Sequence, residues 1–474
     1  MAQKTVVVAG AGPNGLAAAV AMARAGFEVV VREAASEIGG GTRTAELTLP
    51  GFLHDVCSAV HPMGAVSPFF RELALERYGL VWVHPPILMA HPFDDGSAAA
   101  LYRSVSETAA SIGADGRAYH KLMQPFVDRW EDVVMEALSP PLRIPRHPLL
   151  MARFGMSGLR SALGLLRARF TDDRACAFFA GIAAHTLLPL DRSPSAAFGM
   201  MLALAGHAAG WPFARGGSQR IAEALCSVLR AHGGSVETGV PVTSLDELDD
   251  AAAVLLDLTP RQVLGIAGDA FPQSYARQLR RFRHAPGVFK VDWALSQPIP
   301  WTAPECGRAG TIHIGPSTAA IAASAQAAWY GRRDEYPYII LAQPTLFDSS
   351  RAPADRHTAW AYCHVPHGST LDMTPAIEGQ VERFAPGFRE TILARSALSP
   401  AALELHNANL IGGDINGGVH DMRQFLFRPV ASRDPYRTPL ERVFLCSAST
   451  PPGAAVHGMC GYHAARSALR RIAS

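Results

Sequence analysis

The first 45 residues follow the apolar and glycine pattern of a strand, a turn, a helix and a second strand. Thr5 to Ala9 is a β-branched run typical of a buried parallel strand. The alanine-rich stretch 16–25 predicts a helix, and 27–31 predicts a second strand that leads to Glu33. This order of elements indicates a parallel α/β sheet.

The turn between that first strand and the helix has the glycine spacing of a dinucleotide-binding loop. Gly10 allows the tight turn, Gly12 lets a pyrophosphate approach the backbone, and Gly15 lets helix and strand pack closely. Pro13 and Asn14 lie between them, where the N–H groups and dipole of the helix N-terminus favour phosphate. We therefore expect all five residues to bind a cofactor.

A second cofactor motif begins with the acid at the end of the second strand. Glu33 is placed to accept hydrogen bonds from ribose hydroxyls, and its carboxylate disfavours the 2′-phosphate of NADP. The segment Gly40-Gly41-Thr42-Arg43 follows. It resembles the GG motif of the FAD-dependent amine oxidase and phytoene desaturase superfamily. That resemblance places Arg43 near the flavin and its diphosphate, and it favours FAD over NAD.

Two later segments resemble other parts of the same FAD site. In the middle of the chain, a predicted helix (219–231) is followed by a strand that returns to the cofactor domain, and the resemblance implies that Val242 contacts the adenine. Near the end, an apolar run (443–446) leads through a glycine loop to a helix from about His463. The resemblance implies flavin contacts for Gly453, Val456, His457, Gly458 and Met459.

The resemblance extends over nearly the whole chain. The sequence is similar to the phytoene dehydrogenase-related NAD(P)/FAD-dependent oxidoreductases. The segments that carry this likeness, besides the glycine motifs, are HAPGVFKVDWAL (284–295), PIPW (298–301), AQPTLFD (342–348), HTAWAYCHVPHG (357–368), GGDINGG (412–418) and QFLFRP (424–429).

The expected fold class is α/β (α+β overall) with two domains. One is a Rossmann-like FAD-binding domain of the glutathione reductase and amine oxidase type, made of 1–100, 213–275 and 405–474. The other is a substrate domain with a mixed sheet and a helical lid, made of 101–212 and 276–404. Helices are expected at 116–138, 156–170, 172–186 and 193–209, and strand 289–295 is expected to pair with 360–365.

Composition narrows the class of protein further. A net charge of +2 over 474 residues gives no sign of nucleic-acid binding. Seven scattered cysteines without metal-type spacing indicate reduced thiols, and neither a signal peptide nor a 20-residue apolar span is visible. We therefore expect a cytoplasmic protein whose partner is a small apolar organic substrate, with no metal.

The segment 139–171 holds six arginines and no acid. Four of them recur every seven residues among Leu, Met and Phe, at positions 146, 153, 160 and 167. This pattern is compatible with a basic amphipathic surface in peripheral contact with anionic lipid. The alternative is a solvated arginine face, because Pro148, Gly155 and Gly158 interrupt a continuous helix.

The chemistry expected of the family is removal of a hydride from a substrate carbon by FAD. The resemblance suggests His61, Asp414 and Gln424 as polar groups near the flavin, although each is also compatible with a purely structural role. The leading hypothesis is a desaturase or dehydrogenase acting on an isoprenoid, lipid or polyketide-like molecule. The alternatives are an amine or amino-acid oxidase, a redox-neutral flavin-dependent isomerase, and a GDI-type lipid-binding protein that is not an enzyme.

Overall fold

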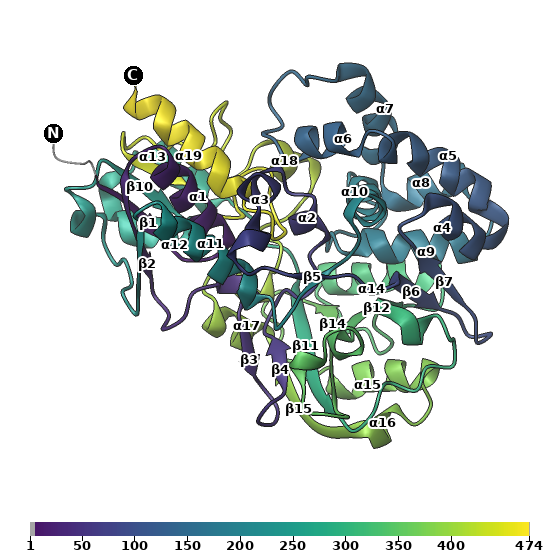
Figure 1. Ribbon diagram of the computed structural model, residues 1–474. Coiled ribbons are helices and arrows are strands. Elements are labelled where there is room, and N and C mark those ends of the chain that lie inside the picture. Colours follow the sequence, from purple (N-terminus) through teal and green to yellow (C-terminus); the bar gives the residue numbers. More distant parts are fainter. Residues whose placement is uncertain (1–4, 474) are drawn as a thin grey trace.

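A parallel five-stranded sheet forms one side of the molecule in the computed structural model, which describes residues 5–473 (Figure 1). Its strand order is β16-β10-β1-β2-β9, and every neighbouring pair is parallel. The strands are β1 (Thr5–Ala9), β2 (Glu28–Glu33), β9 (Ser235–Thr238), β10 (Ala253–Leu256) and β16 (Val443–Leu445).

Helices cover both faces of this sheet, which explains the continuous apolar run of β1. Val6 and Val8 belong to the core on one face, whereas Val7 and Ala9 belong to the core on the other. One layer consists of α1 (Pro13–Arg24), α11 (Gln219–Ala231) and α19 (Met459–Ile472). The other consists of α12 (Pro260–Ala267) and α13 (Gln273–Arg280). A strand with both faces buried is apolar at every position.

A seven-stranded mixed sheet forms the second layer of the molecule. Its order is β15-β11-β14-β13-β12-β6-β7, and every pair is antiparallel except β6 with β12. The predicted pairing of 289–295 with 360–365 is confirmed, with Val291 opposite Ala361. The strands are β6 (Ile87–Pro92), β7 (Ala98–Leu101), β11 (Gly287–Leu295), β12 (Ala309–Ile314), β13 (Ile339–Ala342), β14 (His357–Val365) and β15 (Ile392–Leu398).

A helical lobe packs above this mixed sheet (Figure 1). It is made of α4 (Val105–Ser111), α5 (Gly116–Val127), α6 (Trp130–Ala137), α7 (Pro148–Gly158), α8 (Ala162–Arg169), α9 (Asp173–Ala184) and α10 (Ser195–Ala209). The apolar helix α10 is central, and Gly199 lets it approach α9, since a Cβ there would lie 2.8 Å from the Phe179 ring. No described helix is long and apolar enough to cross a bilayer.

Shorter elements connect these layers. Two small two-stranded antiparallel sheets pair β3 (Thr44–Glu46) with β4 (Leu53–Asp55), and β5 (Trp82–Val83) with β8 (Phe213–Ala214). The remaining α-helices are α2 (Pro62–Ala65), α3 (Pro68–Leu73), α14 (Thr318–Trp329), α15 (Thr374–Phe384), α16 (Phe388–Thr391), α17 (Pro400–His406) and α18 (Met422–Leu426).

Several predicted boundaries differ from those of the structure. The expected helix 116–138 is two helices, α5 and α6, and Pro125 lies in the last turn of α5, where it removes a backbone donor. The expected helix 156–170 is also two, because Ser161 caps a new helix by accepting a hydrogen bond from the Gly164 N–H at 3.1 Å. The last helix begins at Met459 rather than near His463.

The sheet topology also bears on the predicted domain division. Strand β6 and all but the last residue of β7 lie inside the segment 1–100, which was expected to belong to the FAD-binding domain, but both strands pair in the seven-stranded sheet. Their apolar sequences do not indicate which sheet they join, because β12, the strand that links them to that sheet, comes from a distant part of the chain. The division into two domains at the stated boundaries stays a prediction.

Candidate functional site

The glycine turn after β1 is held in the geometry that close packing requires. Gly10 has φ +103°, a left-handed conformation that favours glycine, and its N–H donates to the Arg32 carbonyl at 2.8 Å. Gly12 is the N-cap of α1. A Cβ on Gly15 would lie 2.0 Å from the Gly10 carbonyl oxygen. The start of α1 can therefore pack this closely against the turn only because position 15 has no side chain.

Asp257 supports this turn from beneath, and the sequence prediction missed it. It follows β10, and its carboxylate accepts the Gly15 N–H at 2.9 Å. A Cβ on Gly12 would lie 2.9 Å from the Asp257 Oδ2. The two partners are 242 residues apart, so only the fold brings them together. The available signal was an acid directly after the apolar run AVLL, at the carboxyl end of a strand next to β1.

Burial gives Asp257 an unusual titration. Loss of hydration raises the pKa of its carboxyl from 3.8 to about 7. Between about pH 4 and pH 7 the folded chain therefore holds a proton that the unfolded chain releases, so the free energy of unfolding falls as the pH rises.

We expect Asp257→Asn to remove this part of the pH dependence while keeping an oxygen that accepts from Gly15. In thermal melts followed by circular dichroism at about pH 5 and about pH 8, the variant should gain stability relative to the wild type as the pH rises. Other titrating groups are common to both proteins and cancel in the difference. If the melting temperature of the variant differed from that of the wild type by the same amount at both pH values, the raised pKa of Asp257 would be contradicted.

Glu33 and Arg43 form a buried pair beside the turn. The Glu33 carboxylate accepts the Ala11 N–H at 2.7 Å and the Ala35 N–H at 2.9 Å, and Arg43 Nη2 lies 3.3 Å from its Oε1. Arg43 also donates to the His406 carbonyl at 3.0 Å. Both side chains are less than one-tenth exposed and line the same cavity. The carboxylate keeps lone pairs for ribose hydroxyls.

The second glycine motif packs directly on the first. A Cβ on Gly40 would lie 3.2 Å from the Gly12 Cα, so the two backbones are in contact. The Thr42 hydroxyl donates to the Gly39 carbonyl at 2.8 Å and closes this short turn. Gly40 and Gly41 both line the cavity, as does Thr42. Motifs about thirty residues apart in the chain therefore form one wall.

One cavity of about 1120 Å³ connects all of these features. It extends from Glu33 and Val242 at the parallel sheet, past the glycine turns, to Trp360 and Tyr362 on β14 and into the helical lobe. In that lobe four residues of α10 line it, and their spacing places them on one face of the helix: Ala197, Phe198, Met201 and Leu202. The volume exceeds the usual range for one small ligand.

The charges in this cavity gather at one end. The Asp, Glu, Lys and Arg side chains among its lining residues are Arg32, Glu33, Arg43 and Asp257, and all four belong to the parallel-sheet end. The part inside the helical lobe is lined by Met151, Phe154, Leu159, Phe198, Met201 and Leu202. One end of the cavity is thus suited to a polar, charged ligand, and the other to an apolar one.

The C-terminal loop closes the cavity between these ends. Val456 and His457 line it, and the His457 Nδ1 accepts the Met459 N–H at 3.0 Å. Burial lowers the pKa of His457 to about 4, so the ring is neutral and its proton is on Nε2. Gly458 is the N-cap of α19, and a Cβ there would lie 2.5 Å from Phe70.

The predicted cofactor residues divide into two groups. Those that line the cavity are Gly10, Gly12, Pro13, Asn14, Glu33, Gly40, Gly41, Thr42, Arg43, Val242, Val456 and His457. Gly15, Gly453, Gly458 and Met459 lie behind it, where they support the turns. Contact of each residue with the cofactor stays a prediction.

Of the three polar candidates for the chemistry, His61 alone lines the cavity. Its Nε2 bonds to the Ser218 hydroxyl at 2.8 Å, and its Nδ1 has no hydrogen-bond partner among the described residues. Burial lowers the pKa of this ring to about 4, so it is neutral at pH 7. Gln424 is occupied with main-chain groups: it accepts from the Arg283 N–H at 2.8 Å and donates to the Arg283 and Val419 carbonyls.

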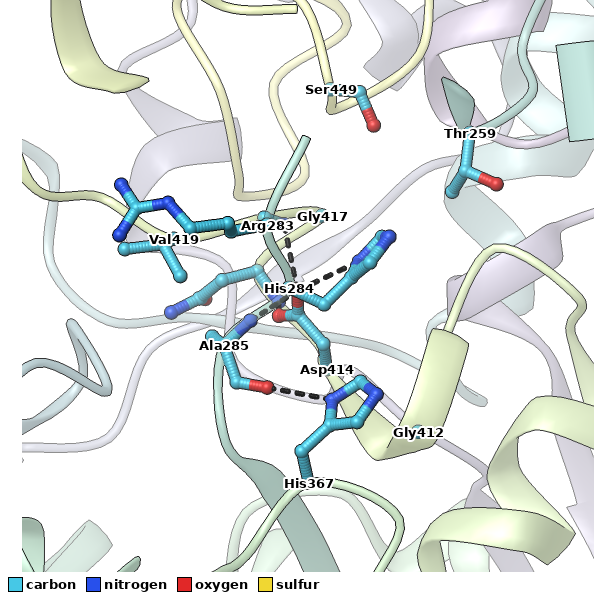
Figure 2. Close-up of polar contacts among 12 residues, drawn as sticks. Thr259, Arg283, His284, Ala285, His367, Gly412, Asp414, Gly417, Val419 and Ser449 are labelled. Atoms are coloured by element: carbon cyan, nitrogen blue, oxygen red, sulfur yellow. Dashed lines mark hydrogen bonds and ion pairs between the residues drawn. The ribbon is translucent and has the colours of Figure 1, made fainter. Parts of the chain in front are cut away.

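Asp414 organises a loop, as Figure 2 shows. Its carboxylate accepts the Ala285 N–H at 2.9 Å and the Gly418 N–H at 2.8 Å, and His284 Nδ1 lies 3.3 Å away. The side chain is fully buried and does not line the cavity. Its neighbours 415–417 do line it. Asp414 is therefore placed to position this wall rather than to touch a ligand.

A further polar group in the cavity, His185, was not predicted. It lies at the mixed-sheet end, and its Nε2 is 3.0 Å from the Nε2 of His313, so one of the two rings must donate a proton to the other. Burial lowers the pKa of His185 to about 4. Because it lies in an apolar helical segment, no local pattern distinguishes it from a core histidine.

The cavity fits FAD by its polar atoms as well as by its shape. Buried polar atoms without a protein partner occur on lining residues along its length: Asn14 Oδ1, Arg43 Nε, His61 Nδ1, Ser449 Oγ and His457 Nε2. Such groups are costly to bury unless a ligand or water bonds to them. An elongated molecule with a diphosphate, sugar hydroxyls and a polar ring edge supplies partners of this kind.

The fold and this site define an FAD-dependent oxidoreductase, and the comparisons with known proteins agree. The model of the family "Flavin containing amine oxidoreductase" matches residues 14–271, and the chain belongs to that family. The family match confirms FAD as the cofactor and sets aside the alternative of a protein that is not an enzyme.

Individual relatives match over most of the chain. Pyridine nucleotide-disulfide oxidoreductase domain-containing protein 2 of Rattus norvegicus is 24% identical over 98% of this chain and 93% of its own. Phytoene dehydrogenase of Streptomyces griseus is 27% identical over 82% of this chain and 77% of its own. The structure of a putrescine oxidase double mutant superposes with a TM-score of 0.64 at 18% identity, and the match covers 100% of this chain and 99% of that one. The structural match confirms the predicted fold class.

Proposed function

We propose that the protein is a dehydrogenase or desaturase that removes a hydride from a largely apolar substrate, of the isoprenoid, lipid or polyketide-like kind. The observation that carries this proposal is the absence of Asp, Glu, Lys and Arg from the helical-lobe part of the cavity lining within residues 5–473. A charged substrate there would lose its hydration without gaining a counter-ion, which is costly. The name of the phytoene dehydrogenase relative points in the same direction.

The reaction removes a hydride and a proton from neighbouring carbons and leaves a double bond. FAD, when bound, supplies the acceptor for the hydride. The chain's own residues hold the cofactor at the glycine turns, exclude water with the side chains of α7 and α10, and orient the substrate between α10 and β14. Among the neutral imidazoles that line the cavity, His61 and His185 are our candidates to take up or pass on the proton.

The amine oxidase alternative has less support from this cavity. Trp360 and Tyr362 both line it, as an aromatic pair for an ammonium ion would. Their rings, however, stack on each other at 13° with centroids 5.8 Å apart, which leaves no gap for a cation between them. The Lys290 ammonium already lies 5.4 Å from the Trp360 ring.

The proposal is tested by anaerobic mixing of the holoprotein with a panel of isoprenoid, fatty, polyketide-like and amine compounds. Loss of the flavin absorbance at about 450 nm reports hydride transfer. We expect bleaching by apolar compounds, with products that lack two hydrogens. Products of unchanged mass would indicate an isomerase, and bleaching by amines alone would overturn the proposal.

A further inference from the structure

Large apolar side chains project into solvent from α7 and from the segment before it. Ile144 is 89% exposed, Leu149 86% and Met156 72%. Figure 1 shows this helix and the loop leading to it at the outer edge of the helical lobe. An isolated apolar side chain on a surface is ordinary, but several on one short segment indicate an interaction site.

Arginines lie among these side chains. On α7, Leu149, Arg153 and Met156 are spaced so that they share the outer face of the helix. Arg143 pairs with Glu136. Within residues 5–473 the other arginines of the segment 139–171 form no ion pair, and all of them are exposed: Arg146, Arg153, Arg160, Arg167 and Arg169. The segment contains no acid that could neutralise them.

The opposite face of the same helix lines the cavity. Met151, Phe154 and Gly155 face inward as lining residues. Leu159, just after the helix, lines the cavity and is also 50% exposed, so it lies at a rim. A single helix therefore separates the apolar part of the cavity from the exposed apolar and basic surface.

We propose that this surface docks on an anionic lipid bilayer, with Ile144, Leu149 and Met156 inserted among the acyl chains. We define it as the α7 patch, formed by these three residues together with Arg146, Arg153 and Arg160. Apolar side chains beside unpaired cations are the combination that binds anionic interfaces. A second copy of the chain fits less well, because a symmetric contact would bring arginines against arginines. Docking in this way would let an apolar substrate pass from the bilayer into the cavity through the rim at Leu159. This delivery rests on the proposed function, whereas the docking itself does not.

The test is flotation of the FAD-loaded full chain with vesicles of phosphatidylcholine alone or with about 30% phosphatidylglycerol. We expect binding to the anionic vesicles only, weakened by raised salt. Arg153→Gln/Arg160→Gln should lower the partition coefficient about tenfold or more, and Ile144→Ser/Leu149→Ser should lower it similarly. Flavin absorbance of the recovered protein confirms that each variant is folded.

Matched controls lie in other parts of the molecule. Arg277→Gln/Arg280→Gln removes the same charge from exposed positions on α13, and Leu393→Ser removes an exposed leucine from β15. Both should bind like the wild type.

Failure of the wild type to float with anionic vesicles would overturn the docking. The docking would also be overturned if the patch variants bound anionic vesicles as well as the wild type does. A dimer of the wild type that the patch substitutions dissociate would overturn it too. None of these results depends on turnover, so the proposed function would stand or fall separately.

Discussion

Replacing Gly15 with alanine is expected to give protein that lacks bound FAD. The new Cβ would lie 2.0 Å from the Gly10 carbonyl oxygen and 3.2 Å from the Asp257 Cβ. The nearer obstacle is backbone, which cannot rotate away, so the turn must open and the seat of the diphosphate is lost. Flavin released by heat from the purified variant should fall below roughly a tenth of one equivalent.

Gly265→Ala is the matched control for this substitution. Gly265 lies within α12, and a Cβ built there would meet no described atom within 4 Å apart from its chain neighbours and the backbone of its own helix. Alanine is favoured over glycine in a helix by about 1 kcal/mol, so this variant should keep its flavin and melt at the same temperature or slightly higher. A Gly15→Ala protein with a full equivalent of FAD would contradict the assignment of the turn.

Met201→Glu is expected to lower the rate of flavin reduction by apolar substrates about a hundredfold without loss of FAD. Met201 is half-buried on the face of α10 that lines the cavity, away from the glycine turns. A carboxylate there lies among apolar side chains, and no Lys or Arg of the described residues lines this part of the cavity. The carboxylate therefore holds water, which disfavours binding of an apolar substrate. Stopped-flow reduction under anaerobic conditions measures the effect.

Two controls separate charge in the cavity from other effects. Met201→Leu conserves volume and apolarity and should keep most of the rate. Met135→Glu places the same charge on α6 at a side chain that is 43% exposed, and it should change little. Wild-type rates in Met201→Glu would mean that the substrate does not enter the helical-lobe part of the cavity.

Local parts of this site could be predicted from the sequence because their partners are near in the chain. The turn, Glu33 and the segment 40–43 lie within 35 residues of each other, and glycine spacing encodes their backbone geometry. The role of Asp257, and the long-range contact of Asp414, could not be predicted in this way. One carboxylate supports a turn 242 residues earlier, and the other accepts the Ala285 N–H from 129 residues away.

The helix α10 illustrates a different limit. Its sequence is apolar nearly all round, which is compatible both with a core helix and with a cavity wall. In the structure α10 is both a core helix and a cavity wall. Ala203 to Gly206 are buried in the lobe, and the face that carries Ala197 and Met201 borders the cavity. Apolarity alone cannot distinguish packing against protein from packing against a ligand, because both remove the same surface from water.

The most direct test of an apolar substrate is a comparison of two compounds of equal chain length, an isoprenoid hydrocarbon and the corresponding primary amine. The quantity is the ratio of their rate constants for anaerobic reduction of the bound flavin in the wild type. Among residues 5–473, no carboxylate lies on the helical-lobe lining, which predicts a ratio well above about ten in favour of the hydrocarbon. Faster reduction by the amine would contradict the proposed function.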